Sequence, residues 1–283
     1  MIMDDPIRCG LQSTGSVLGV DVGFSPTRRS SAVCRLDWDD RWIAWSIQRF
    51  RAQPAEMAAT ITAVAGGRKL EAAAFDGPLQ PGFEPIGHYR TAERMLTRRI
   101  GIKISKPGQS HAPMGKLLNQ AANKCVRLVL DHCDVAPARH GVPIDARAVV
   151  EAFPTGFLGL MLEQPSLIVA VRSDRSDVYF RFLAKDGTLR RLALHLLPGR
   201  AFHGSPDGVI NHDDRAAWVC ALTALCVAAG DFTAVGDANG WIILPPRAFT
   251  AGWASDDLEV NARETGCVGS YYCAMLTSAA GPP

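Results

Sequence analysis

The sequence predicts an α/β fold in which a mixed β-sheet is flanked by helices and expanded by a basic helical insertion. Short apolar runs at 17–22, 71–76 and 147–153 have the composition of buried strands. Pro54 opens a segment with apolar residues at helical spacing, and this segment lies between the first two runs. Because a helical crossover joins parallel strands, we expect 17–22 and 71–76 to be parallel.

A β-hairpin is predicted before that helix. Residues 31–36 and 42–50 read as strands, and the polar stretch 37–41 between them is typical of a turn. The two strands should therefore be antiparallel, and the acids of the turn should be structural. The helix is expected over 54–65, because a pair of glycines ends its apolar periodicity.

The rest of the chain alternates helices with short strands. Residues 213–229 are apolar on nearly all sides, which predicts a buried helix capped by Gly230. Residues 176–198 fit either a strand or a helix. The other expected elements are a basic helix near 89–100, a second helix near 115–133, a helix that begins at Pro154, and a short strand at 241–244.

One domain is expected over 16–246, with the helical insertion at about 80–145 and a weakly patterned C-terminal extension at 247–283. The chain has 283 residues and is 47% hydrophobic and 20% charged, as is ordinary for a globular protein. No apolar run approaches the roughly 18 residues that span a bilayer, so no membrane partner is expected.

The cysteines and the N-terminus favour a cytoplasmic protein. The first residues do not resemble a secretory signal, and the eight cysteines form no C-x-x-C pair. We therefore expect most cysteines to be small buried side chains rather than ligands of structural zinc.

Positive charge is concentrated in the predicted insertion. Between His88 and Arg127 the chain has nine Lys and Arg residues and one acid, Glu93, although its formal net charge is only +2. A basic element beside an acidic core suits contact with nucleic acid phosphates, and the alternative is a solvated helical face. The side chains predicted to contact DNA or RNA are Arg90, Arg94, Arg98, Lys103 and Lys106.

Three carboxylates, Asp21, Asp76 and Glu151, lie at or near the ends of the three buried strands. A charge on a buried strand is costly unless something pairs with it, so these acids are expected to converge and to share a cation. Asp213 and Asp214 begin the buried helix and are candidates for a further metal ligand.

Each acid also has a structural alternative. Asp21 could cap a turn, and Asp76 precedes Gly77-Pro78 and suits an Asx turn. Asp213 or Asp214 would suit a helix N-cap. Glu151 lies inside an apolar run, where a structural role is harder to explain.

Six short strings occur in an order that resembles the RNase H-like fold. They are Gly19-Val20-Asp21, Phe75-Asp76-Gly77-Pro78-Leu79, Tyr89-Arg90-Thr91-Ala92-Glu93, Val150-Glu151-Ala152-Phe153-Pro154, Cys220-Ala221-Leu222-Thr223-Ala224 and Gly240-Trp241-Ile242-Ile243-Leu244-Pro245. The closest resemblance is to domain-of-unknown-function family 429, a family of predicted nucleases. One departure is Ala216, which stands where such families have an acid at the start of the last helix.

The resemblance implies a nuclease that hydrolyses phosphodiester bonds with two Mg²⁺ or Mn²⁺ ions. Asp21 would bridge both ions, and Asp76 and Glu151 would each complete one coordination shell. Asp214, or Asp213 in its place, would hold the second ion. His212 would orient a water or accept a proton during product release.

Two other classes of function stay open. The D-x-G strand also opens the sugar kinase, Hsp70 and actin group, but the chain has no second copy of the fold and no G-x-x-x-x-G-K-[ST] loop. A non-catalytic module that binds nucleic acid or a protein partner and keeps an acid cluster is the other alternative. A nucleophilic hydrolase is disfavoured because no G-x-S-x-G elbow occurs. The sequence leaves the oligomeric state open.

Overall fold

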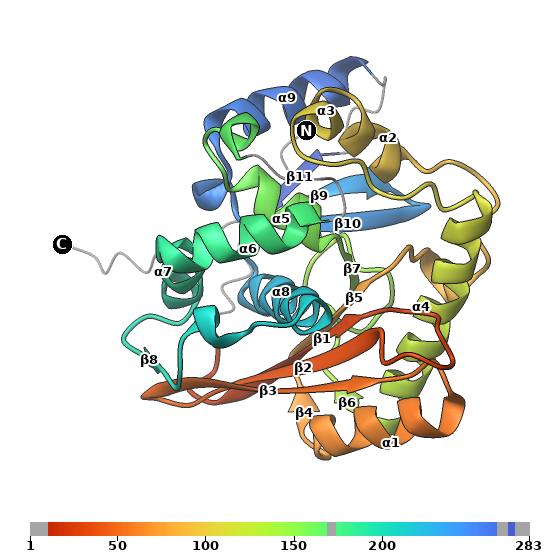
Figure 1. Cartoon of the computed structure of the whole chain (residues 1–283), viewed down its shortest axis with the longest axis vertical. Coiled ribbons are helices and arrows are strands. Elements are labelled where there is room, and N and C mark those ends of the chain that lie inside the picture. Colours follow the sequence, from red (N-terminus) through yellow and green to blue (C-terminus); the bar gives the residue numbers. More distant parts are fainter. Residues whose placement is uncertain (1–10, 169–173, 265–270, 275–283) are drawn as a thin grey trace.

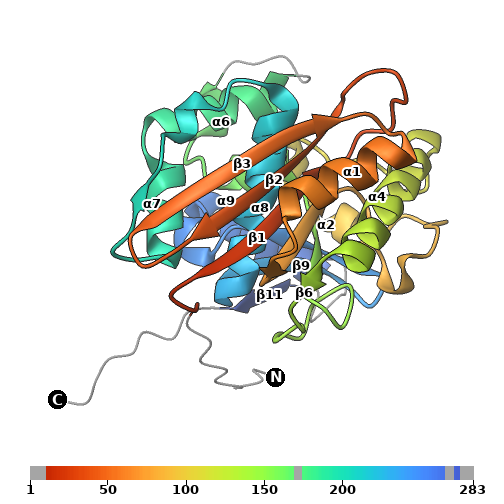
Figure 2. The same cartoon turned by 90° about the horizontal axis from the view of Figure 1, so that it is seen from below.

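A mixed β-sheet forms the centre of the protein, and helices cover both of its faces (Figures 1 and 2). The computed structural model describes residues 11–168, 174–264 and 271–274. Within these residues the main sheet has the strand order β11-β9-β10-β7-β5-β1-β2-β3-β8, and β4 and β6 form a separate pair. The predicted α/β class, with a mixed sheet flanked by helices, is therefore confirmed.

The first three strands form an antiparallel meander. β1 (Gly15–Asp21) pairs with β2 (Ser31–Trp38), and β2 pairs with β3 (Trp42–Phe50). At the turn between β2 and β3, the Asp39 carboxylate accepts hydrogen bonds from two backbone N–H groups of the same turn, both at 2.7 Å. This acid has the structural role that the sequence predicts.

Parallel strands continue the sheet on the other side of β1. β5 (Ala72–Asp76), β7 (Val149–Ala152) and β10 (Gly240–Leu244) follow in that order and run parallel to β1. β10 then pairs antiparallel with β9 (Phe232–Asp237), which the sequence analysis did not predict. Only four residues of β9 precede Gly236, so its apolar run is too short to stand out. The remaining strands are β4 (Lys69–Leu70), β6 (Asp134–Val135), β8 (Ala201–Phe202) and β11 (Tyr271–Ala274).

Helices pack on the sheet in two layers (Figure 2). One face is covered by α8 (His212–Ala229), which contacts β1, β2 and β5, and around it lie α5 (Pro154–Leu160), α6 (Arg175–Lys185) and α7 (Thr188–Leu196). The other face is covered by α1 (Pro54–Ala65) and α4 (Pro113–His132). Beside β9, α2 (Thr91–Thr97), α3 (Arg99–Lys103) and α9 (Gly252–Glu264) pack against one another. Short 3₁₀ turns are η1 (Pro81–Phe83), η2 (Pro165–Leu167), η4 (Pro206–Gly208) and η5 (Arg247–Phe249).

Most predicted elements occur where expected, and β3 and α1 have the predicted bounds. The ambiguous stretch 176–198 is two helices, α6 and α7, separated at Gly187, whose φ of 80° an L side chain rarely adopts. The predicted basic helix near 89–100 is divided at Arg98 into α2 and α3. The weakly patterned tail contains α9, and its residues 265–270 and 275–283 lie outside the described residues.

Each face of the sheet has its own hydrophobic core. Val17 on β1 belongs to the core beneath α8, and the neighbouring Leu18 belongs to the core beneath α1 and α4. Five cysteines are buried free thiols, as predicted: Cys34, Cys125, Cys133, Cys220 and Cys226. Cys9 and Cys267 lie outside the described residues. Within the described part of the chain, every helix is too short or too polar to cross a membrane.

Candidate active site

Two aspartates end neighbouring strands at the same level of the sheet. Asp21 is the last residue of β1, Asp76 is the last residue of β5, and the two are direct partners in the parallel register. Such partners point to the same face, and their strands lie about 4.8 Å apart. Both side chains are half-buried. The structure thus brings these two predicted acids together.

Gly19 allows α8 to lie directly on β1. A Cβ at this position would be 2.0 Å from the backbone nitrogen of Ala221 and 2.4 Å from the carbonyl oxygen of Ala217. Residues two apart in a strand share a face, so Gly19 and Asp21 both point towards α8. The close contact at Gly19 therefore brings the beginning of α8 to the strand-end acids.

The first turn of α8 adds two more acids. Asn211 is its N-cap, because the side-chain oxygen accepts hydrogen bonds from the backbone N–H groups of Asp213 (3.0 Å) and Asp214 (3.5 Å). The alternative that one of these aspartates caps the helix is wrong. Ala216, where the resemblance leads us to expect an acid, is buried. Asp213 and Asp214 are therefore the acids that α8 contributes.

Burial and mutual repulsion raise the pKa values of these carboxyl groups. Burial is the largest cause for Asp21, whose pKa lies well above its usual value, and the charges of Asp76 and of the two α8 aspartates raise it further. Burial also raises the pKa of Asp76 to about 7, the charge of Glu151 adds to the rise, and His212 opposes it. Asp21 is thus within electrostatic range of the three other aspartates.

Positive charge from β3 partly compensates the aspartates of α8. Burial raises the pKa of Asp213 and that of Asp214, and Arg49 opposes both rises. Nε of Arg49 lies 3.7 Å from Oδ1 of Asp214. This oxygen is buried and has no hydrogen-bond partner among the described residues. The cluster thus holds a buried acceptor whose hydrogen-bonding capacity is unused.

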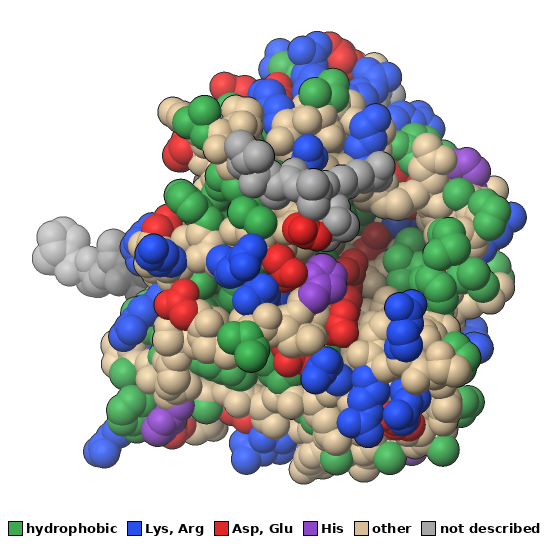
Figure 3. Space-filling view, viewed as in Figure 1, with side chains coloured by type: hydrophobic (Ala, Val, Ile, Leu, Met, Phe, Trp, Pro, Cys, Tyr) green, Lys and Arg blue, Asp and Glu red, His purple; other side chains and the backbone are tan. Residues whose placement is uncertain are grey.

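The surface is hollowed and acidic in the middle of the face shown in Figure 3. Asp and Glu side chains gather in this hollow, a histidine lies beside them, and Lys and Arg side chains border them. His212, at the start of α8, has a side chain that is 53% exposed. Its Nδ1 lies 3.3 Å from Oδ1 of Asp177 on α6, and Nη1 of Arg215 lies 3.1 Å from the same oxygen. Neither Asp177 nor Arg49 could be predicted from the sequence, because only tertiary packing brings them to the cluster.

Glu151 does not join the aspartates, which corrects the sequence prediction. In the register of β5 and β7 it pairs with Phe75, so it points to the opposite face from Asp76. Both carboxylate oxygens are bound there: Arg90 donates from Nη1 to Oε2 at 2.7 Å and from Nη2 to Oε1 at 2.8 Å, and the Leu79 N–H donates to Oε2 at 2.8 Å. A metal ion would have to displace a bidentate ion pair.

Arg90 is not at the surface, which corrects its predicted contact with nucleic acid. Its side chain is 1% exposed, and it also donates from Nε to Oε1 of Glu93 at 2.8 Å and from Nη1 to the carbonyl oxygen of Leu79 at 2.7 Å. Three partners thus take four of the five N–H donors of the guanidinium. Arg90 therefore joins α2 to the end of β5 and to β7 in the interior.

The other predicted basic residues lie at the surface. Arg98 pairs with Glu264 at 3.1 Å, and Lys103 pairs with Asp257 at 2.7 Å, so the acids of α9 neutralise these two. Arg94 and Lys106 are exposed. The basic segment is thus one buried arginine, several pairs with α9 and a few exposed cations, rather than one continuous basic face.

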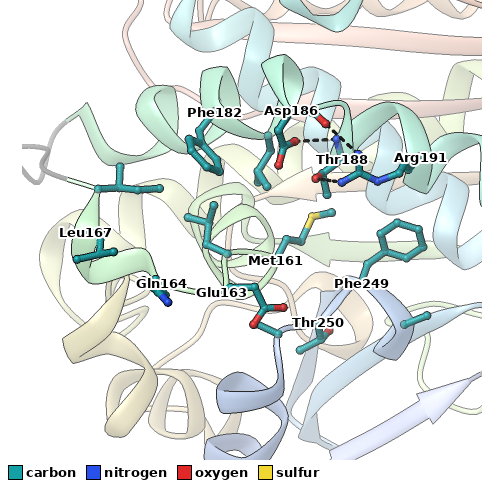
Figure 4. A pocket seen from close by; sticks show the side chains of 15 residues that line it. Met161, Glu163, Gln164, Leu167, Phe182, Asp186, Thr188, Arg191, Phe249 and Thr250 are labelled. Carbon is teal, nitrogen blue, oxygen red and sulfur yellow. Dashed lines mark hydrogen bonds between the residues drawn. The ribbon is translucent and has the colours of Figure 1, made fainter.

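A cavity of about 670 Å³ is lined by residues that are not part of the acid cluster (Figure 4). Met161, Phe182 and Phe249 give it apolar walls, and its lining includes none of the predicted site residues. Arg191 at its edge donates to the carbonyl oxygen of Asp186 at 2.9 Å and to the Thr188 hydroxyl at 2.5 Å. This cavity has no group in common with the acid cluster.

The acid cluster draws four aspartates from three elements, β1, β5 and α8. No family model, curated protein or solved structure matches this chain. In the part of the chain that the structure describes, no group of three or more His, Cys, Asp and Glu side chains has the geometry of a formed metal site. Without a matching relative, the chemistry of the cluster has to be inferred from its own residues.

The raised pKa of Asp76 predicts that stability falls as pH rises. A carboxyl group that binds its proton more tightly when folded stabilises the protein below its ordinary pKa, and this stabilisation is lost as pH rises from about 4 to about 7. Without divalent cations, Asp76→Asn should flatten this decline and raise the stability at pH 8 by on the order of 1 kcal/mol, or about 2 °C. Thermal unfolding in EDTA between pH 4 and pH 8 measures both effects.

The matched control is Asp131→Asn, which changes an exposed aspartate of α4. It should follow the wild-type curve over the whole pH range. If Asp76→Asn is no more stable than the wild type at pH 8, the carboxylate of Asp76 is not under repulsion.

Proposed function

We propose that this protein hydrolyses phosphodiester bonds of nucleic acid with divalent cations held by Asp21, Asp76, Asp213 and Asp214. The observation that carries the proposal is the convergence of these acids: Asp21 and Asp76 are direct partners at the ends of β1 and β5, and burial together with the charges of Asp76, Asp213 and Asp214 raises the pKa of Asp21. Carboxylates that repel one another in a half-buried place store an unfavourable energy that a bound cation removes.

Mg²⁺ and Mn²⁺ fit the donor set. All four aspartates offer hard oxygen ligands, which these ions prefer, and the buried Oδ1 of Asp214 has no hydrogen-bond partner within the described residues. When bound, such ions supply a nucleophilic water and stabilise the negative charge that develops at phosphorus. Glu151 is excluded from the proposed set because Arg90 and Leu79 bind both of its oxygens.

The element order supports the RNase H-like part of the proposal. Three antiparallel strands are followed by a helix and then by β5, parallel to β1, and acids lie on the first of these strands, on β5 and at the start of α8. This is the order that family 429 and the RNase H-like fold led us to expect. Membership in that family remains our proposal.

The residues around the aspartates have distinct tasks in this proposal. The four carboxylates hold the cations, and Arg49 and His212 offer hydrogen bonds to phosphate oxygens at the border of the cluster. Nδ1 of His212 lies 3.3 Å from Oδ1 of Asp177, and the two form an ion pair when the imidazole is protonated. His212 keeps its predicted task of orienting a water or accepting a proton during product release.

Cleavage of labelled DNA, RNA and DNA–RNA hybrids in Mn²⁺ tests this function. The wild type should cleave at least one substrate, and Asp21→Asn should reduce the rate at least about 100-fold. That factor corresponds to about 2.7 kcal/mol, which is within the several kcal/mol that a bound metal ion contributes to catalysis. Asp131→Asn should cleave at the wild-type rate, and EDTA should abolish the activity.

A melting experiment separates metal binding from catalysis. Mn²⁺ should raise the melting temperature of the wild type, because a ligand of the folded state stabilises it by mass action, and the rise should be smaller in Asp21→Asn. Cleavage that is equal in the wild type and Asp21→Asn would contradict the proposal. Stabilisation by Mn²⁺ without cleavage of any substrate would favour the binding module over the nuclease.

A further inference from the structure

Arg49 lies in the same row of the sheet as the strand-end acids. Asp21 is paired with Ala32 on β2, and Ala32 is paired with Arg49 on β3, so the three residues share one face. Two strand spacings, or about 10 Å, separate Asp21 from Arg49 along this row. The side chain of Arg49 is 44% exposed and reaches Asp214 at 3.7 Å. The positively charged side chain of Arg49 thus lies on the β3 side of the acidic hollow.

The loop that follows Asp21 lies against the end of β3. Three consecutive carbonyl oxygens of the loop, those of Ser25, Pro26 and Thr27, accept hydrogen bonds from residues 51–53 at 2.9, 2.7 and 3.1 Å. At the base of the loop, the Gly23 N–H donates to the Ser31 hydroxyl at 3.0 Å. Residues 22–30 therefore form an ordered platform beside the acids, which we call the β1–β2 loop.

The β1–β2 loop exposes cations and an aromatic ring. Arg28 and Arg29 are exposed, and the side chain of Phe24 is 42% exposed. Glu56 forms ion pairs with both Arg29 at 3.2 Å and Arg51 at 3.0 Å. Among the described residues Arg28 has no ion-pair partner. The single carboxylate of Glu56 is thus shared by two arginines, and the β1–β2 loop keeps a net positive charge.

We propose that the β1–β2 loop and Arg49 bind a single-stranded segment of the nucleic acid substrate next to the acid cluster. Arg28, Arg29 and Arg49 bind its phosphates, and Phe24 stacks on a base. A base is accessible to an exposed ring only where the strand is unpaired, and arginines with an adjacent aromatic ring suit this kind of ligand. This inference rests on the proposed function, because it assigns the substrate path of the same site.

The surface of α2 and α3 is the competing path, and its charges are less available. Arg90 is buried there, and Arg98 and Lys103 are paired with acids of α9. Arg94 and Lys106 are exposed there without an ion-pair partner among the described residues. The β1–β2 loop also begins directly after β1 and Asp21, whereas α2 lies beside β9. Charge and position therefore both favour the β1–β2 loop.

Fluorescence anisotropy with labelled oligonucleotides in EDTA tests the path without cleavage. The probes are single-stranded DNA, single-stranded RNA and duplex DNA of one mixed sequence. Arg28→Ala/Arg29→Ala should weaken single-strand binding at least tenfold and reduce the salt dependence of log K by about 1.4, the value for two phosphate contacts on a single strand. Phe24→Ala should weaken single-strand binding about tenfold, with a smaller effect on the duplex.

The matched control is Arg94→Ala/Lys106→Ala, which also removes two exposed cations and should stay within twofold of the wild type. Circular dichroism must show the same fold for all variants. Equal losses in both double variants, a larger loss in the control, or no binding of any probe by the wild type would overturn the assignment. Binding that depends on the β1–β2 loop in a protein that cleaves nothing would uphold the path and reject the hydrolase.

Discussion

Replacing Arg90 with methionine is expected to destabilise the protein by about 3–5 kcal/mol, a lowering of the melting temperature on the order of 10 °C. The guanidinium is 1% exposed and is bound to the carboxylates of Glu93 and Glu151. Methionine fills much of its volume but leaves both acids buried without a counter-charge. Urea or thermal unfolding at pH 7 measures the loss.

Arg94→Met provides the control for this effect. Arg94 is exposed on the same helix, so its replacement should change the stability by no more than about 0.5 kcal/mol. Arg90→Met/Glu151→Gln should recover part of the loss, because one of the two unpaired charges is then absent. If Arg90→Met unfolds like Arg94→Met, the buried ion pairs do not hold α2 to the sheet.

Replacing Gly19 with alanine is expected to cost about 3 kcal/mol and to impair the site as well. The new Cβ would lie 2.0 Å from the backbone nitrogen of Ala221, and a backbone atom cannot move aside without moving α8. The aspartates of α8 would then be displaced from Asp21 and Asp76. Unfolding and the Mn²⁺-dependent rise in melting temperature measure the two consequences separately.

Gly87→Ala is the corresponding control, since a Cβ there has nothing within 4 Å. It should leave both the stability and the response to Mn²⁺ unchanged. Wild-type stability in Gly19→Ala would mean that α8 does not pack on β1 through this glycine.

The sequence predicts elements whose signals are local. β3 and α1 agree with their predicted bounds because the turn before β3, and the Pro54 and glycine pair that bound α1, act within a few residues. β9 was missed because its strand character comes from pairing with β10 and β11. A short strand forms its hydrogen bonds with neighbouring strands, so its own sequence carries little signal of it.

The residues of the candidate site also differ in whether a local sequence signal marks them. Asp21 and Asp76 were found because each ends a buried strand. Glu151 was misassigned because its partner Arg90 is 61 residues away and both lay in strings that suggested function. Arg49 was overlooked because its place beside the acids depends on the register of three strands. The sequence pattern does not show which charged side chains pair with one another in the folded protein.

α8 is buried along nearly its whole length, so the acids at its start have little freedom to move. Asn211 caps its beginning, Gly230 in the left-handed conformation caps its end, and β1, β2 and β5 lie beneath it. Buried, well-packed helices are among the last elements of a protein to open locally. The aspartates of the first turn of α8 are therefore held by a well-packed element. If nucleic acid is the substrate, as we propose, its backbone adjusts to acids that a buried helix and two strand ends hold in place.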